Sequence, residues 1–227
     1  MRRINFILAI VAVLLSACNS DVVKVRGEVE GLKGKVKLLA EMPGQEGLVV
    51  LDEQDVTDGE IDLRTEEFKI PGRVWVDIDG KATIEAILDT KDLIWIEGKI
   101  KFPSEIEAKG SGLMDEYASL RKMYKEKYDD VIKPLDAKIE KIATKEKMTR
   151  DDEVMLGIYQ LRKQRYIQQR ANWTKQLIEA NPTREISLFL LKDELADSLD
   201  AQKRLFRKLV VQNKESNIYK VLESKLK

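Results

Sequence analysis

The sequence contains no histidine among its 227 residues. Histidine is the side chain whose ordinary pKa lies near neutral pH, so its absence excludes Ser-His and Cys-His nucleophile systems and histidine-ligated zinc. The sequence also lacks a serine nucleophile motif and a glycine-rich phosphate loop between a strand and a helix. Carboxylate, lysine and tyrosine chemistry stays open. We therefore predict no enzyme, with no catalytic residues, no cofactor and no metal ion.

Cysteine and long apolar runs are almost absent as well. Cys18 is the only cysteine, so the chain cannot form an internal disulfide, a Cys-x-x-Cys redox pair or a cysteine-rich metal site. The only long apolar run covers residues 4–17, and no other segment approaches the 18 residues of a transmembrane helix. At ~1.5 Å per residue this run would span ~21 Å, less than the ~30 Å core of a bilayer. The run therefore predicts a secretory signal instead of a membrane span.

The flanks of this run indicate a lipid anchor. Arg2 and Arg3 precede it and Leu15-Ser16-Ala17 end it, which is the basic, apolar and small-residue order of a signal peptide. With Cys18 added, these residues resemble the lipobox of bacterial lipoproteins. The resemblance implies that the signal peptidase recognises Leu15, Ser16 and Ala17, and that acyl chains are attached to Cys18. An ordinary cleaved signal peptide with an incidental cysteine is the alternative.

The residues after the cysteine bear on localisation. Residues 1–17 are expected to be removed and residues 18–23 to form a short lipidated tether. In proteobacterial sorting, aspartate directly after the lipidated cysteine favours the inner membrane, and Asn19 stands there instead. We therefore expect secretion through the inner membrane and anchoring in the outer membrane, facing the periplasm. The membrane is then one partner, an envelope protein is a possible second partner, and no nucleic acid is expected.

Charge divides the remaining 210 residues into two parts. Residues 18–111 carry 13 Lys and Arg against 21 Asp and Glu, a net charge of −8. Residues 112–227 carry 25 against 19, a net charge of +6. The split predicts two units with different surfaces, which can dock on each other.

Residues 24–111 read as a β-domain. Short segments alternate polar and apolar residues and are rich in β-branched and aromatic side chains, which is typical of half-buried strands. Turn pairs such as Pro43-Gly44, Asp58-Gly59 and Asp79-Gly80 separate them. About seven such strands predict an antiparallel β-sandwich or open barrel.

Residues 112–227 read as a helical domain, so the fold class is α+β. From Leu113 to Ile142 apolar residues recur every three or four positions, the pattern of a long amphipathic helix that Pro134 should bend or divide. Thr149 predicts the start of a second long helix that ends before Asn181-Pro182. A turn near 143–149 would make an antiparallel hairpin of the two. Shorter helices are predicted at 183–196, 200–212 and 216–226.

Three clusters are candidate sites. The densest acidic stretch is Asp52, Glu53, Asp55, Asp58, Glu60 and Asp62. A calcium loop built around Gly59 would place Gln54, Val56 and Thr65 at ligand positions, and none of these offers a carboxylate, so a solvated hairpin turn is favoured.

The other two clusters lie in the helical domain. Tyr117, Tyr124 and Tyr128 share one helix face with Leu120 and Val131, and core packing is favoured over an aromatic ligand platform. A basic run suggests nucleic-acid binding, but a secreted chain favours a solvated face or contact with an acidic surface. This run comprises Arg162, Lys163, Arg165 and Arg170, interleaved with Tyr166 and Trp173.

The order of features resembles Bacteroidota lipoproteins that begin with the domain of unknown function 4369. The matching segments are Val25–Gly31, Val36–Leu38, Leu51-Asp52 with Val56–Gly59, Lys109–Gly112 with Asp115–Tyr117, and Asn217–Leu222. The resemblance implies a β-domain and a helical segment, followed in that family by a thioredoxin-like, disulfide-reductase-type domain. Here the sequence ends at Lys227 without a Cys-x-x-Cys pair, so we expect that domain and its reductase activity to be missing.

Three hypotheses about function follow. The first is a non-catalytic, lipid-anchored binding or scaffold module of the cell envelope. The second, which rests on the resemblance alone, is an accessory to a separate thioredoxin-like oxidoreductase. The third is a glycan hydrolase with two carboxylates roughly 5–10 Å apart across a cleft.

Overall fold

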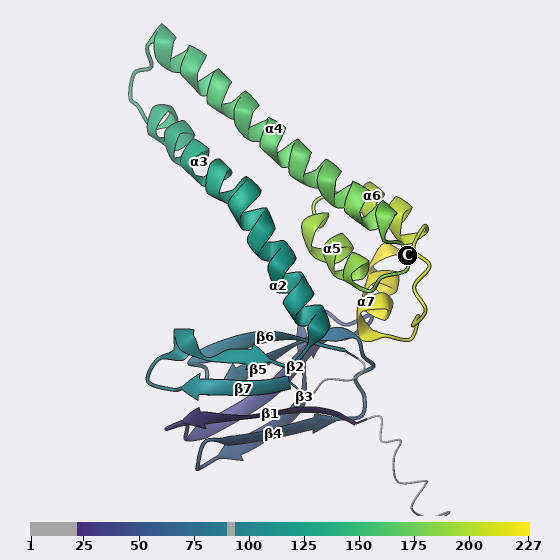
Figure 1. The fold of residues 1–227 in the computed structure, drawn as a ribbon. Helices are drawn as coiled ribbons and strands as arrows, with labels where there is room; N and C mark the ends of the chain where they lie inside the picture. Colours follow the sequence, from purple (N-terminus) through teal and green to yellow (C-terminus); the bar gives the residue numbers. More distant parts are fainter. Residues whose placement is uncertain (1–21, 90–93) are drawn as a thin grey trace, which may run out of the picture.

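The computed structural model describes residues 22–89 and 94–227. Two four-stranded sheets occupy the N-terminal part and helices follow, so the predicted α+β fold with a β-sandwich is confirmed (Figure 1). One sheet has the strand order β4-β1-β7-β8 and the other β3-β2-β5-β6. The strands are β1 (Val23–Glu30), β2 (Gly34–Glu41), β3 (Leu48–Val56), β4 (Glu60–Thr65), β5 (Gly72–Ile78), β6 (Ala82–Leu88), β7 (Ile94–Lys99) and β8 (Glu107–Lys109).

The sandwich core forms from the alternation visible in the sequence. In β1 every second residue from Val23 to Val29 is buried, and in β4 Ile61 and Leu63 are buried between acidic and basic neighbours. These side chains share one apolar cluster with those of the second sheet, including Leu38. Because side chains alternate across a strand, one face of each sheet enters this core and the other stays free for a different surface.

One strand pairing departs from the predicted antiparallel arrangement. β1 runs parallel to β7, whereas every other pairing among the described strands is antiparallel. The five strands between them in sequence supply the long connection that a parallel pair requires. Gly27 lies at this pairing, and a Cβ there would be 2.1 Å from the carbonyl oxygen of Ile96. The close approach of the two backbones therefore requires glycine.

The first arm of the helical hairpin comprises α2 (Gly112–Tyr124), a π-helical turn (Lys125–Asp129) and α3 (Asp130–Ala143). Pro134 was predicted to bend or divide this arm, and division is wrong, because α3 continues through it. A proline ring crowds the carbonyl four residues earlier, here that of Asp130. The wider π-helical turn ends at this point, and we attribute the tolerance of Pro134 to it.

The second arm is α4 (Arg150–Ala180), which is 31 residues long and spans roughly 46 Å. Its predicted start is confirmed in detail: the Thr149 hydroxyl accepts a hydrogen bond from the Asp152 N–H (3.2 Å), and the Asp152 carboxylate accepts one from the Thr149 N–H (3.1 Å). This reciprocal capping box satisfies two backbone donors at the helix end. The helix ends at Ala180, where Asn181-Pro182 was predicted to stop it.

Three short helices pack at the base of the hairpin: α5 (Ile186–Glu194), α6 (Leu199–Phe206) and α7 (Asn217–Leu226). The first six residues of α5 are all buried, so this helix is the centre of the second apolar cluster. The prediction that the middle helix reaches residue 212 is wrong. Leu209 and Val211 are buried while Val210 between them is 64% exposed, and the Val210 N–H donates to the Pro182 carbonyl.

The C-terminal segment fastens the helices to the sandwich. The backbone N–H of Asn217 donates to the Lys69 carbonyl (2.6 Å), and its side-chain amide donates to the Glu41 carbonyl (2.8 Å). Asn213 donates to the Ile70 carbonyl in the same way (2.7 Å). Among the described helices, none combines the length and the apolar character needed to cross a bilayer.

Candidate functional site at the junction of sandwich and helices

The residues of the predicted lipid site, Leu15, Ser16, Ala17 and Cys18, lie outside the described residues. Lipid attachment therefore stays a prediction. Val22 is the first described residue, and β1 starts at the next one. An anchor at Cys18 would accordingly be separated from the sandwich by a few residues only.

The acidic stretch at residues 52–62 covers the end of β3, the following turn and the start of β4. Gly59 has φ = 93°, a conformation that favours glycine, so the Asp58-Gly59 turn is confirmed. The two strands do not pair as a hairpin, however, because the turn joins strands of two different sheets. The side-chain amide of Gln54 on β3 bridges to β4. It accepts a hydrogen bond from the Asp62 N–H (2.9 Å) and donates one to the Glu60 carbonyl (3.1 Å). Among the described residues no three His, Cys, Asp or Glu side chains group as a metal site would require.

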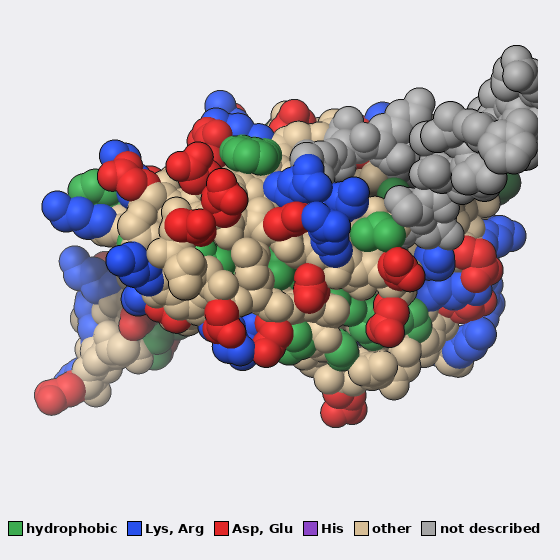
Figure 2. Space-filling model, turned by 90° about the horizontal axis from the view of Figure 1, so that it is seen from below, with side chains coloured by type: hydrophobic (Ala, Val, Ile, Leu, Met, Phe, Trp, Pro, Cys, Tyr) green, Lys and Arg blue, Asp and Glu red, His purple; other side chains and the backbone are tan. Residues whose placement is uncertain are grey.

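The outer surface of the sandwich away from the helices carries charges of both signs, interspersed over the face shown in Figure 2. Asp62 on β4 is typical, since its carboxylate pairs with Arg64 and Arg26. The hydrogen bond from Arg64 is the largest cause that lowers the pKa of Asp62, to about 2. Neighbouring charges on this face thus neutralise one another.

The three tyrosines predicted to pack in the core are buried, which confirms that prediction. The ring of Tyr124 meets Trp173 edge-on with centroids 5.1 Å apart, and its hydroxyl lies 2.6 Å from the Thr174 hydroxyl. Burial raises the pKa of Tyr124 to about 12, although the hydrogen bond with Thr174 acts in the opposite direction. Tyr128 packs beside it with ring centroids 6.1 Å apart.

The basic run on α4 separates into two groups. Lys163 and Arg170 form ion pairs with acids of neighbouring helical segments. Arg162 and Arg165 are exposed, and neither forms an ion pair with a described residue. The predicted solvated face therefore holds for Arg162 and Arg165 only.

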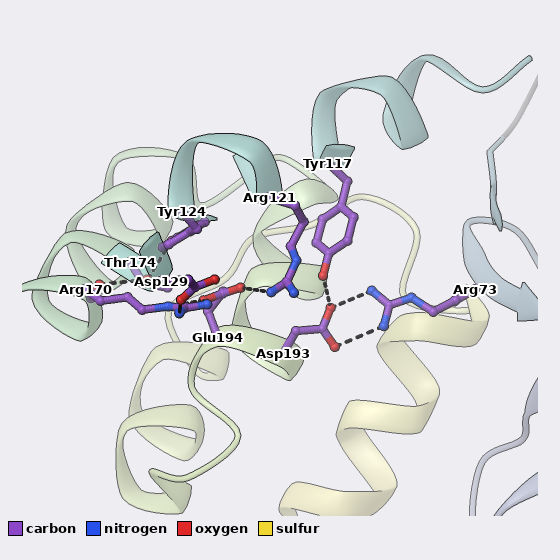
Figure 3. A network of polar contacts seen from close by, with 9 residues as sticks. All are labelled: Arg73, Tyr117, Arg121, Tyr124, Asp129, Arg170, Thr174, Asp193 and Glu194. Atoms are coloured by element: carbon purple, nitrogen blue, oxygen red, sulfur yellow. Dashed lines mark hydrogen bonds and ion pairs between the residues drawn. The ribbon is translucent and has the colours of Figure 1, made fainter. Parts of the chain in front are cut away.

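A network of polar contacts lies where β5, α2 and α5 meet (Figure 3). Arg73 of β5 donates through both terminal nitrogens to Asp193 of α5, at 3.1 and 2.5 Å. Tyr117 of α2 donates its hydroxyl to the same carboxylate at 2.5 Å. The remaining nitrogen of Arg73, Nε, lies 3.0 Å from the Glu85 carboxylate in an ion pair that lacks hydrogen-bond alignment. Asp193 thus joins the sandwich to two helices.

The next residue, Glu194, continues the network into the hairpin. Its carboxylate accepts from Arg121 of α2 at 2.5 Å and pairs with Arg170 of α4 at 2.7 Å. Arg170 also pairs with Asp129 in the π-helical turn. The Glu194 side chain is only 1% exposed, so both cations are needed to compensate its buried charge. Two consecutive acids therefore hold four elements together.

The electrostatics of the network fix its protonation. Burial by itself would lower the pKa of Arg73, but the hydrogen bonds and charge of Asp193, together with Glu85, more than offset it and raise that pKa. Burial is also the main cause that raises the pKa of Tyr117, with the Asp193 charge adding to it. Arg73 and Tyr117 consequently keep their protons throughout the ordinary pH range.

An open pocket of about 670 Å³ lies over this junction. Its polar lining includes Glu85 and Asp193, both paired with Arg73, and Glu41, which pairs with Lys192 at 2.5 Å. The pocket therefore offers a mixed-charge surface whose carboxylates already have cationic partners. Such a surface suits polar contacts more than proton transfer.

Comparison with known proteins gave no match to a family model, to a curated protein or to a solved structure. The fold and the junction define an α+β protein in which a buried charge network joins the sandwich to the helical hairpin. Its function has to be inferred from that geometry.

Sequence reasoning did not identify Arg73, Asp193 or Glu194. The alternation of β5 places Arg73 on the outer face with Trp75, where a charged residue is expected to meet solvent. The one sequence feature that could have indicated a role for Arg73 is its position as a charged residue in an otherwise largely apolar strand. Asp193 and Glu194 follow the buried run of α5, and nothing in their spacing distinguishes them from other acidic pairs.

Proposed function

We propose that this chain is a lipid-anchored cell-envelope protein that binds a protein partner and catalyses no reaction. The anchor would be Cys18, with the protein attached to the outer membrane and facing the periplasm. The observation that carries the binding role is the hairpin formed by α3 and α4, which projects well beyond the rest of the molecule (Figure 1). Its α4 helix exposes several large apolar side chains: Val154, Met155, Ile158, Leu161 and Ile167.

Exposed apolar groups gathered on one element are characteristic of an interaction surface. In α4 they are concentrated in the half that the short helices α5–α7 leave uncovered. The hairpin is also held at a defined angle, because Glu194 ties its two arms together at the base through Arg121 and Arg170. A projecting, fixed and partly apolar arm supports a scaffold role.

The state of the carboxylates argues against the hydrolase alternative. A glycosidase needs two carboxyl groups across a cleft, one of which has to donate a proton. In the junction pocket Glu85 and Asp193 share Arg73, and Glu41 is paired with Lys192. Each of these acids is thus engaged with a cation, which suits a binding surface.

Two measurements on cells test the proposal. A palmitate analogue should label the protein through Cys18, and Cys18→Ala should abolish both labelling and membrane association. Persistent labelling of the variant would refute the anchor. Proteins captured from envelope extracts with the intact chain then test the binding role. A thioredoxin-like oxidoreductase among them would support the accessory hypothesis instead, and recovery of no partner and no second copy would refute binding.

A further inference from the structure

Three of the exposed apolar residues of α4 form one continuous stripe. Val154, Ile158 and Leu161 are spaced by four and three residues, so they lie on the same side of the helix. They are 56%, 50% and 67% exposed, although side chains of this type are ordinarily buried. No described residue of the hairpin covers them.

The other side of α4 already has its partner. Lys163 pairs with Asp136 of α3 at 2.5 Å, and the ammonium of Lys138 of α3 lies 5.3 Å from the ring of Tyr159. Tyr159 and Lys163 are four residues apart and thus lie on one face, turned well away from Ile158. The stripe is therefore a second apolar surface that folding of the chain leaves unpaired.

Charges at the ends of the stripe have opposite signs. Asp151 lies seven residues before Ile158 and Arg165 seven residues after it, which is about two helical turns or ~10 Å in each direction. Neither forms an ion pair with a described residue, whereas their neighbours Asp152 and Lys163 do. Both lie on the same side of the helix as the stripe.

We infer that the stripe binds the same stripe of a second copy of this chain, with the two α4 helices antiparallel about a twofold axis at Ile158. This arrangement rests on the proposed binding role of the hairpin and names its partner. The axis places Ile158 against its counterpart and each Val154 near the other copy's Leu161. It also brings each Asp151 opposite the other copy's Arg165, because the two are equally distant from the axis.

The opposite charges at the two ends of the stripe favour a second copy of the chain, and not a lipid surface, as its partner. A helix that lies on a membrane carries Lys and Arg along its polar face, whereas here an acid occupies one end of the stripe. A twofold contact between identical patches is the commonest way for soluble proteins to associate, and it needs no second component. The contact is one helix face wide and so smaller than the ~1,200–2,000 Å² of stable interfaces. The dimer is accordingly weak, and confinement of copies on one membrane would strengthen it by raising their local concentration.

Cysteine cross-linking tests the arrangement in cells that make the full chain. Cys18 is the only natural cysteine, so any cross-linking of the unsubstituted chain measures the contribution of Cys18 alone. Ile158→Cys places two thiols at the axis, within the distance that a disulfide allows. We expect an oxidant to give several-fold more dimer of twice the chain mass with Ile158→Cys than with Ile167→Cys. Ile167 is a matched control, since it is 40% exposed on the opposite side of the same helix.

Equal cross-linking of the two variants, or none, would overturn the inference. Cross-linking of Ile158→Cys to a different protein would also overturn it, yet would leave the proposed binding role standing. Loss of palmitate labelling is a separate result that bears only on the anchor. The three failures can thus be told apart.

Charge exchange tests the register. In the Ile158→Cys chain, Asp151→Arg or Arg165→Asp alone should reduce dimer formation several-fold, because each places like charges opposite one another. The two changes together should restore it. Failure of the double variant to recover, with helical circular dichroism unchanged, would overturn the antiparallel register.

Discussion

Arg73 and Asp193 lie 120 positions apart in the sequence and form a two-point ion pair that joins the sandwich to the helices. Their side chains are 9% and 18% exposed. A buried pair of this kind contributes little against an apolar replacement, but removal of one partner leaves a charge uncompensated. Its main effect is to fix how the two units sit on each other.

Asp193→Ala should therefore lower the free energy of unfolding by about 3 kcal/mol, the lower end of the cost of breaking a buried pair, because Arg73 keeps only the exposed Glu85 as a partner. Urea denaturation measures this change. Asp62→Ala in the exposed cluster with Arg26 and Arg64 is the control, and we expect it to have a small effect because surface pairs contribute little. Equal effects of the two substitutions would contradict the assigned role of the junction.

Tyr124 should ionise at a higher pH than an ordinary tyrosine. Since burial raises its pKa to about 12 from the ordinary 10.0, the folded state favours the neutral form. Its contribution to stability is complete below pH 10 and is lost as the pH rises through about 12. The difference in phenolate absorbance between the natural chain and Tyr124→Phe should show this titration. A midpoint at 10 in the folded protein would contradict the burial.

The start of α4 should weaken in acid. The hydrogen bond from Lys145, followed by those from Thr149, lowers the pKa of Asp152 to about 2 from 3.8. The capping contribution is therefore complete above pH 3.8 and is lost as the pH falls through about 2. Thr149→Ala should cost about 1 kcal/mol at neutral pH. Helical circular dichroism of both chains from pH 5 to pH 2 measures the effect, and identical profiles would contradict it.

Two glycines should respond to alanine in opposite ways. Gly27→Ala forces a methyl group against the Ile96 carbonyl and should destabilise by at least about 1–3 kcal/mol. In Gly157→Ala the new methyl group inside α4 meets no atom within 4 Å, and the substitution should stabilise by about 0.5–1 kcal/mol through helix propensity. Thermal unfolding compares them, and loss of stability in both would contradict the open surroundings of Gly157.

The elements that could be predicted from the sequence are those specified by neighbouring residues. The alternation of β1, the cap at Thr149 and the end of α4 before Asn181 each depend on a few adjacent side chains, and each is confirmed. What could not be predicted depends on partners distant in sequence. The parallel direction of β7 and the passage of α3 through Pro134 belong to this group.

The charge network at the junction could not be predicted from the sequence for the same reason. Strand alternation assigns Arg73 to solvent, and only the arrival of α2 and α5 on that side of β5 buries it. A periodic pattern says which side of a strand is polar but does not say what will cover that side. Consecutive acids such as Asp193 and Glu194 acquire their role only when three other elements, β5, α2 and α4, converge on the end of α5.

The position of β1 within its sheet has a mechanical consequence. This strand is the first of the described chain, yet it is central, with six residues in register with β4 on one side and six with β7 on the other. A force applied at the N-terminus and directed along the strand would load both ladders in shear, so many hydrogen bonds would have to break together. Resistance to forced unfolding is governed by that barrier to rupture. The sandwich is thus built to bear tension at the end where the proposed anchor attaches.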